Sequence, residues 1–313
     1  MKKFAYSIVT LGALALAAPA HAFTLGIIAF QMSSETHARC ANAAADEAKK
    51  KGWTVQVLNS GGSLPTHAAQ IEDMIQKKVD ALIICMGKPV EADAQLADAQ
   101  KAGIPVVTAV AGASPHTLFD VEVNEFEDGA VAAAYLLGKM DYRGNILEER
   151  FEQNVATRER DKVLDAVLSE NQAVKVVGVH TMARTKTWQQ DVRAGMQALI
   201  LQNKGNFKGI WASFDGQAYI IDDLLKSQGM KKGDVVLVSL DGGPETYRRI
   251  KDPDSLITAT VAIPFEQIGR TAVDAVDKVV VQKVPKQQVA SGPYILLNAT
   301  LVDAGNVDSV MKH

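Results

Sequence analysis

Residues 235–244 read VVLVSLDGGP, and this stretch decides the fold. Its apolar run is typical of a strand in the middle of a parallel sheet, because helices cover both faces of such a sheet. The run ends abruptly at Asp241, which two glycines and a proline follow. A carboxylate in that place acts as a nucleophile, a metal ligand or a ligand-binding residue, or it only begins a tight turn.

Similar apolar runs recur along the chain and alternate with amphipathic helical patterns. This alternation predicts parallel sheets with right-handed crossovers and helices on both faces. The predicted strands are residues 24–30, 54–58, 81–85, 105–109, 144–147, 174–179, 209–211, 235–240, 256–263 and 294–297. The predicted helices are residues 37–51, 66–77, 92–102, 128–140, 159–170, 187–202, 218–228 and 265–282.

These strands are too many for one compact sheet, and 313 residues are enough for two domains. We expect an α/β protein whose two parallel sheets lie in separate lobes, with chain crossings near residues 121–124, 263–264 and 292–293. The N-terminal lobe would then comprise residues 23–123 and 264–292. The C-terminal lobe would comprise residues 124–263 and 293–313. Three crossings would join the two lobes by a hinge.

Residues 1–22 have the pattern of a secretory signal peptide. Lys2 and Lys3 precede an apolar segment at residues 4–18, and the small-residue sequence AHA ends at Ala22. No later apolar segment approaches the length of a membrane span. We therefore expect a protein exported to the periplasm. With a formal net charge of −3 and no basic block, the composition does not indicate a nucleic-acid partner.

The sequence lacks the motifs of common enzymes. It has no Gly-x-Ser-x-Gly elbow, no phosphate loop ending in Gly-Lys-Ser/Thr, no Gly-x-Gly-x-x-Gly after the first strand and no His-Glu-x-x-His. The histidines that follow the signal pattern are scattered, without the spacing of metal ligands. We therefore expect a protein without enzymatic activity that holds no cofactor and no metal.

Two cysteines are present, Cys40 in a predicted helix and Cys85 at the end of a predicted strand. Their separation in space cannot be read from the sequence. Two buried free thiols are favoured over a disulfide, although an oxidising compartment would allow the disulfide.

Ligands of open parallel sheets bind outside the carboxyl ends of the strands. The segments that follow the predicted strands are therefore candidates, and they are residues 31–34, 59–62, 86–87, 110–111, 155–160, 214–215 and 241–242. They are rich in polar and aromatic side chains. Carboxylates accept hydrogen bonds from hydroxyl groups, guanidinium groups donate them, and aromatic rings pack against C–H faces. This chemistry suits a neutral hydroxylated molecule.

The order and spacing of several short motifs resemble the ribose/galactose-type periplasmic substrate-binding proteins of ABC importers. The motifs are GIIAF and SSETH at the first strand, NVATRERD at residues 154–161, WASFDGQA, VSLDGGP and ATVAIPFEQIG. The similarity extends over essentially the whole chain after the signal pattern. It implies two Rossmann-like lobes joined by a three-strand hinge, which close on one sugar. It also implies delivery of that sugar to a membrane permease.

The resemblance also implies particular ligand-binding residues. The arginine of the family's Ala/Ser-Arg-Glu-Arg segment falls on Arg158, and the family's ligand-binding aspartate falls on Asp241. Asp215 matches the acidic residue of the family's Asn-Asp pair, in which Phe214 replaces the asparagine. Arg160 is expected to have the structural role of a residue paired within its helix.

Further candidates come from the first loop and from aromatic residues. Ser34 and His37 occupy positions where the family often has an asparagine and an aromatic ring. Trp188 lies about one residue from the family's aromatic in the second lobe. Phe30, Phe214 and Trp188 are either aromatic walls of the ligand site or ordinary core residues.

Two departures from the family pattern bear on the ligand. Val110 and Ala111 replace an Asp-Arg pair of ribose-like members, and Ile263 replaces a hinge glutamine. The lost polar contacts favour a polyol, a deoxy sugar or a furanosyl signal molecule over ribose.

Three other functions are compatible with the chain to different degrees. A repressor of the same fold would need a helix-turn-helix where the signal pattern stands. An exported hydrolase would need Asp215 and Asp241 as a paired acid and base. Presentation of the ligand to a chemoreceptor can coexist with transport.

We expect the protein to be a monomer.

Overall fold

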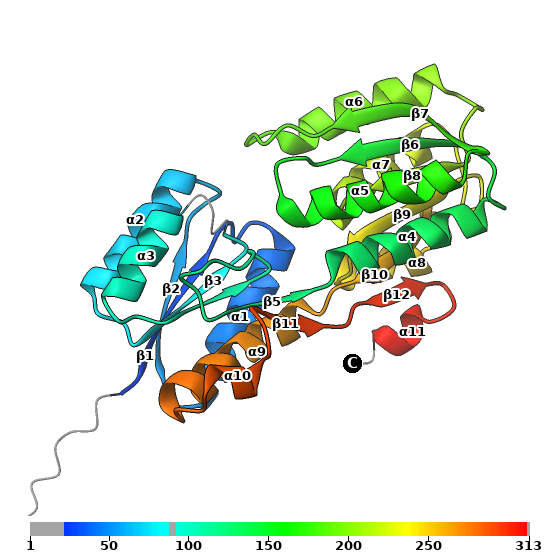
Figure 1. The fold of residues 1–313 in the computed structure, drawn as a ribbon. Helices are drawn as coiled ribbons and strands as arrows, with labels where there is room; N and C mark the ends of the chain where they lie inside the picture. Colours follow the sequence, from blue (N-terminus) through cyan, green and yellow to red (C-terminus); the bar gives the residue numbers. More distant parts are fainter. Residues whose placement is uncertain (1–21, 88–91, 312–313) are drawn as a thin grey trace, which may run out of the picture.

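The computed structural model describes residues 22–87 and 92–311, which form two lobes side by side (Figure 1). Each lobe contains a six-stranded sheet with helices on both faces. The predicted α/β architecture with two sheets is therefore confirmed. The predicted signal peptide, apart from Ala22, lies outside the described residues. Within the described part of the chain, no helix combines the length and the apolar character needed to cross a membrane.

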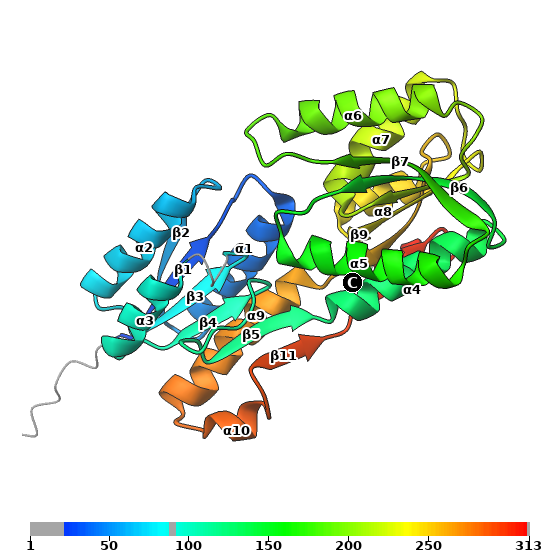
Figure 2. The same cartoon turned by 45° about the horizontal axis from the view of Figure 1, so that its top comes forward.

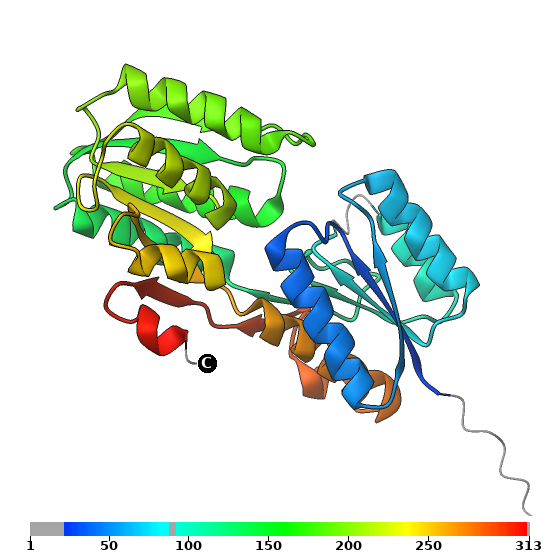
Figure 3. The same cartoon turned by 180° about the vertical axis from the view of Figure 1, so that it is seen from behind.

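The sheet of the first lobe is wholly parallel. Its strands in spatial order are β11 (Tyr294–Leu297), β5 (Phe119–Val123), β4 (Val106–Ala109), β3 (Ala81–Cys85), β1 (Thr24–Ala29) and β2 (Thr54–Asn59). Helices α1 (Glu35–Lys50) and α9 (Phe265–Val276) pack together on one face, as Figure 3 shows. Helices α2 (Leu64–Gln76) and α3 (Asp93–Lys101) cover the other face. A π-helical turn, η2 (Asp277–Val281), continues directly from α9, so the two together match the helix predicted at residues 265–282. Helix α10 (Lys286–Val289) follows.

The sheet of the second lobe is parallel except for one edge strand. Its strands in spatial order are β12 (Thr300–Asp303), β10 (Ile257–Ala262), β9 (Val236–Asp241), β8 (Gly209–Ala212), β6 (Gly144–Arg150) and β7 (Val174–Thr181), and β12 is antiparallel to β10. Helices α4 (Glu125–Lys139) and α5 (Val155–Glu170) cover one face (Figure 2). The other face packs against α6 (Trp188–Gln202), α7 (Asp215–Ser227), α8 (Pro244–Lys251) and α11 (Val307–Val310).

The alternation of side chains along each strand explains why both faces are apolar. On β1, Leu25 and Ile27 belong to the core beneath α1 and α9, whereas Ile28 belongs to the core beneath α2 and α3. Neighbouring residues of a strand point to opposite faces, so a nearly continuous apolar run supplies two cores at once. The run at residues 235–240 behaves in the same way, because Leu237 and Val238 belong to different cores of the second lobe.

The chain crosses between the lobes after β5, after β10 and after β11. The prediction that residues 294–297 belong to the C-terminal lobe is wrong, because β11 pairs with β5 of the first sheet (Figures 1 and 2). The carbonyl of Pro293 already accepts a 2.8 Å hydrogen bond from the Asp120 amide. The third crossing therefore follows Leu297, and the unpredicted strand β12 completes the second sheet.

Three helices of the second lobe begin earlier than predicted. The side chains of Asn124 and Asn154 accept hydrogen bonds from the amides of Glu127 (3.3 Å) and Thr157 (3.4 Å), and so cap α4 and α5. Helix α7 begins at Asp215, where the Gln217 side chain accepts a bond from the Phe214 amide. The predicted helix began at residue 159, whereas residues 155–158 already form the first turn of α5.

Candidate ligand-binding site

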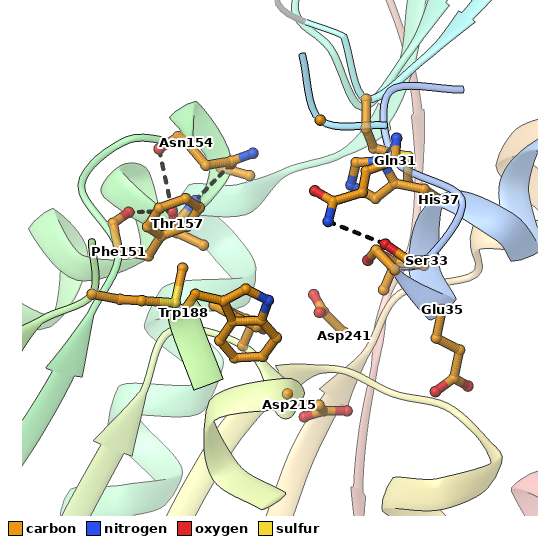
Figure 4. Close-up of a pocket in the computed structure, with 18 of the residues that line it drawn as sticks. Gln31, Ser33, Glu35, His37, Phe151, Asn154, Thr157, Trp188, Asp215 and Asp241 are labelled. Atoms are coloured by element: carbon orange, nitrogen blue, oxygen red, sulfur yellow. Dashed lines mark hydrogen bonds between the residues drawn. The ribbon is translucent and has the colours of Figure 1, made fainter. Parts of the chain in front are cut away.

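A cavity of about 600 Å³ lies between the two lobes at the carboxyl ends of both sheets (Figure 4). Its first-lobe side is lined by residues of the loops that follow β1, β2, β3 and β4 and by residues of α1 and α9. Its second-lobe side is lined by residues of α5, α6 and α7, by the end of β9 and by residues that follow β6, β7 and β8. A second cavity of about 670 Å³ lies near Asp80 and Pro105, at the amino ends of β3 and β4. Only the first cavity has the position that open parallel sheets use for ligands.

The cavity brings together all but one of the predicted site residues. The first lobe contributes Phe30, Ser34 and His37. The second lobe contributes Trp188, Phe214, Asp215 and Asp241. The exception is Arg158, which is not among the lining residues.

Arg160, not Arg158, is the arginine beside Asp241. Arg158 is partly exposed, and its Nη1 donates to the carbonyl of Glu152 at 2.6 Å. The buried Arg160 donates from Nη1 to Asp241 Oδ1 at 3.1 Å and to the Ser213 carbonyl at 2.9 Å. The prediction named Arg158 as the arginine of the ligand site and gave Arg160 a role within its own helix, and the structure corrects both assignments.

The helical geometry of α5 explains this correction. Successive residues of an α-helix are rotated by about 100°, so residues two positions apart point to nearly opposite sides. Within α5 the buried residues are Thr157, Arg160, Asp161 and Leu164. This i, i+3, i+4, i+7 spacing was the signal that identifies the inward arginine, but it is visible only when the helix is started at Val155.

Arg160 is also held by a buried carboxylate from α4. Its Nε and Nη2 donate to Glu125 at 2.6 and 3.2 Å. The side chains of Arg160 and Glu125 are 3% and 2% exposed. Charge-assisted pairs of this kind are strong because little water competes with them. Arg160 therefore presents a rigid donor group to Asp241.

Asp241 is the last residue of β9 and has an unusual backbone, with φ at 130°. Its side chain is 13% exposed and borders the cavity (Figure 4). Burial raises the pKa of the Asp241 carboxyl to about 7; the charge of Asp215 adds to the rise and Arg160 opposes it. Near neutral pH this carboxyl is thus poised between its acceptor form and its protonated form.

Asp215 borders the cavity, but protein donors occupy its acceptor positions. It accepts hydrogen bonds from the hydroxyls of Ser239 (2.5 Å), Thr246 (2.5 Å) and Thr260 (2.8 Å), and from the Gly242 amide (2.8 Å). An ionised carboxylate has about four acceptor positions. These hydrogen bonds give Asp215 a role in holding the turn after β9.

His37 offers a neutral donor on the first-lobe side. Its Nδ1 accepts a 3.1 Å hydrogen bond from the Gln31 amide, so the neutral ring carries its proton on Nε2. Burial and, to a smaller extent, the positive charge of Arg184 lower the pKa of His37 to about 4. The ring is therefore uncharged at neutral pH.

Aromatic rings line the cavity from both lobes. In the second lobe Phe214 lies 6.2 Å from Phe151 and 5.6 Å from Trp188 between ring centroids. The guanidinium of Arg184 lies 5.6 Å from the ring centroid of Phe151 and 5.9 Å from that of Phe30 in the first lobe. Arg184 thus contacts rings of both lobes by cation–π interactions.

The sequence prediction missed Phe151, Asn154 and Arg184, all of which line the cavity. Phe151 follows β6 directly, and Arg184 follows β7 within three residues. The carboxyl-end rule therefore contained the signal for both, but the predicted strands ended too early for it to be applied.

No group of three or more His, Cys, Asp or Glu side chains with a metal-binding arrangement occurs among the residues that the structure describes. Cys40 and Cys85 are buried free thiols whose Sγ atoms lie 3.3 Å apart, which agrees with the favoured prediction.

The sequence model of the family described as "Periplasmic binding protein domain" matches residues 25–283. The chain belongs to this family. Among curated family relatives, the ribose import binding protein of Bacillus subtilis is 25% identical over 261 residues, which cover 82% of this chain and 81% of that protein. The xylitol-binding protein of Mycolicibacterium smegmatis is 25% identical over 268 residues, which cover 82% of this chain and 71% of that protein.

The same fold is found in solved structures. An ABC transporter solute-binding protein from Agrobacterium vitis, crystallised with allitol, superposes with a TM-score of 0.82 at 24% identity. The match covers 93% of this chain and 98% of that protein. The periplasmic binding protein fold, with its two lobes, therefore accounts for the position of the cavity.

Replacing Arg160 by glutamine removes the partner of two carboxylates, Glu125 and Asp241. Loss of one partner of a buried ion pair leaves an unpaired charge, so we expect the free energy of unfolding in urea to fall by about 3 kcal/mol or more. Arg158→Gln is the matched control, and it should change that free energy by less than about 0.5 kcal/mol. Equal losses in the two variants would contradict the assignment.

Protonation of His37 should destabilise the fold. Because its pKa is lowered from 6.5 to about 4, the unfolded chain takes up a proton between these pH values that the folded chain does not bind. Unfolding is therefore favoured as the pH falls through this window. In His37→Asn, whose Oδ1 can accept the bond from Gln31, we expect a shallower fall in unfolding free energy, measured by urea titrations across the window. Parallel pH profiles for the two proteins would disprove this.

Proposed function

We propose that the protein captures a sugar or polyol in the interlobe cavity and delivers it to the membrane permease of an ABC importer. The observation that carries this proposal is the Asp241–Arg160 pair at the carboxyl edge of the second sheet, which faces polar and aromatic residues of the first lobe across the cavity. The printed names of the relatives, a ribose import binding protein and a xylitol-binding protein, support the same class of ligand.

The chemistry of the cavity suits hydroxyl groups with C–H faces between them. Asp241 provides an acceptor, His37 provides a neutral donor, and Gln31 and Asn154 provide amides that both donate and accept. The rings of Trp188 and the neighbouring phenylalanines offer flat surfaces for C–H groups. A polyol or a furanose can use both kinds of contact.

The hinge side of the cavity supports a ligand with fewer polar contacts than ribose. Val110 lines the cavity, and Ile263 is 1% exposed in the apolar core of the first lobe. Neither residue supplies a hydrogen bond from its side chain. A polyol, a deoxy sugar or a furanosyl signal molecule therefore remains our proposal.

The cellular setting belongs to the same proposal. Membership of the periplasmic binding protein family supports a periplasmic location. We propose that the chain is exported to the periplasm by a cleavable leader at residues 1–22 and works there as a monomer. Presentation of the closed form to a chemoreceptor is a second use of the same ligand-bound state.

Hydrolysis is less well supported than binding. The proposed acid and base would be Asp215 and Asp241, but four protein donors already surround Asp215. A carboxylate with its acceptor positions occupied is poorly placed to move protons to or from a substrate. We therefore propose binding without covalent chemistry.

A thermal-shift screen with pentoses, hexoses, deoxy sugars and C4–C6 polyols tests this function. A ligand present at a hundred times its Kd stabilises a protein by about 2.7 kcal/mol, which raises the Tm measurably. We expect at least one of these compounds to raise the Tm and to be recovered unchanged by mass spectrometry. No shift with any compound would overturn the proposal, and conversion of the bound compound would favour a hydrolase.

Binding should also depend on the ionisation of Asp241. The pKa of Asp241 is raised to about 7, and only its ionised form accepts hydrogen bonds with both oxygens. For a ligand found in the screen, we expect calorimetric affinity to increase as the pH rises through 7, provided that Asp241 accepts its hydroxyl groups. Asp241→Asn should bind more weakly and lose this pH dependence. A variant that keeps the same pH profile would show that another group is responsible.

A further inference from the structure

Arg39, on α1 of the first lobe, makes a hydrogen bond to the other lobe. Its Nη1 donates to the carbonyl of Gly242 at 2.5 Å, across 203 positions of sequence. Gly242 directly follows Asp241 in the turn after β9 of the second lobe. Arg39 itself is not among the residues that line the cavity.

The guanidinium of Arg39 is also held by residues of its own lobe. Its Nε and Nη2 donate to Glu266 of α9 at 2.7 and 2.9 Å, and it lies 5.4 Å from the ring centroid of Phe265. Burial opposes ionisation of Glu266, but the hydrogen bonds and charge of Arg39 outweigh it and lower the pKa of Glu266. The donor that meets Gly242 is therefore rigid.

The turn that accepts this hydrogen bond, residues 241–243, has a strained backbone. Asp241, Gly242 and Gly243 have consecutive positive φ angles of 130°, 69° and 156°. Such angles are unfavourable for a residue with a side chain, and Asp241 has one. Strained backbone of this kind persists only where its surroundings hold it.

The two lobes hold opposite sides of the same residue. The Gly242 amide donates to Asp215 of the second lobe, and the Gly242 carbonyl accepts from Arg39 of the first lobe. The next residue is also close to the first lobe. A Cβ atom on Gly243 would lie 2.7 Å from Glu35 Oε1 and 3.0 Å from Arg39 Nη1.

We propose that Arg39 is a positioning residue that couples the relative position of the lobes to the orientation of Asp241. The proposal rests on the ligand-binding function given above. When the lobes are placed as in this structure, Arg39 fixes the Gly242–Gly243 peptide, and Asp215 holds the Asp241–Gly242 peptide before it. The turn held in this way sets the direction of the Asp241 carboxylate. A hinge movement that separates α1 from the turn removes this support. Ligand affinity therefore depends on a residue outside the cavity.

Hydrogen exchange in the ligand-free protein tests this coupling without any ligand. Arg39→Met keeps an unbranched side chain and removes its donors. Arg193→Met, on the exposed surface of α6, is the matched control. We expect amides of residues 240–247 to exchange about tenfold faster in Arg39→Met, the effect of losing one charge-assisted hydrogen bond. Exchange in β6 and β8 of the same lobe should be unchanged.

Affinity provides the second readout. The probe is the one of D-ribose, xylitol and allitol that raises the Tm of the wild-type protein most. We expect this probe to bind Arg39→Met about tenfold more weakly than it binds the wild type. Arg39→Lys keeps one charged donor and should recover part of both the affinity and the exchange protection. Arg193→Met should match the unchanged protein in both measurements.

The outcomes separate this proposal from the proposed function. Unchanged exchange at residues 240–247 in Arg39→Met would overturn the positioning role, as would faster exchange with full affinity. Faster exchange spread evenly over the first lobe, with the turn unaffected, would reduce Arg39 to a residue that only stabilises α1 and α9. If none of the three probes binds the unchanged protein, the sugar or polyol function loses support, and the exchange result still decides the role of Arg39.

Discussion

The cavity depends on one buried carboxylate, that of Asp215. Its four hydrogen bonds come from β9, the turn that follows, α8 and β10, so one side chain connects four segments of the second lobe. Burying a charge is costly unless hydrogen bonds compensate for the lost water, and here they fill the acceptor positions of the carboxylate. This arrangement stabilises a turn in which Asp241 has a positive φ angle and borders the cavity. Asp215 thereby helps to decide where the neighbouring carboxylate of Asp241 lies at the edge of the cavity.

Arg160 is the second constraint on the same turn. It bonds Glu125 from α4, the Ser213 carbonyl after β8 and Asp241 at the end of β9. Glu125 also lies at the point where the chain has just crossed from β5 into the second lobe. The hinge, the helix pair α4 and α5 and the cavity are therefore linked through one guanidinium, whose fixed fork of donors suits several acceptors at once.

Much of this organisation could be predicted from local patterns, and particular residues show where prediction stopped. The apolar runs predicted both sheets, and the position of Asp241 after such a run predicted that it borders a ligand cavity. Arg158 was preferred to Arg160 because it matches the arginine of the family's Ala/Ser-Arg-Glu-Arg segment, but a two-residue shift on a helix reverses the side that a side chain faces. Residues 294–297 were placed in the wrong lobe because a four-residue strand carries no information about the strand it pairs with.

The sequence by itself determined the α/β class, the two-sheet organisation and the residues that follow the strands, since these depend on periodicity and on short-range turn chemistry. Only the tertiary structure decided that Asp215 supports the turn, that Arg160 pairs with Asp241, and that Arg39 and Arg184 reach the opposite lobe. The physical reason is that these interactions join residues far apart in sequence: 81 positions separate Arg160 from Asp241, and 203 separate Arg39 from Gly242. Such contacts depend on how the sheets and helices pack within a lobe and on how the lobes are placed. Local patterns can therefore show which side of an element a residue faces, but not which distant partner it meets.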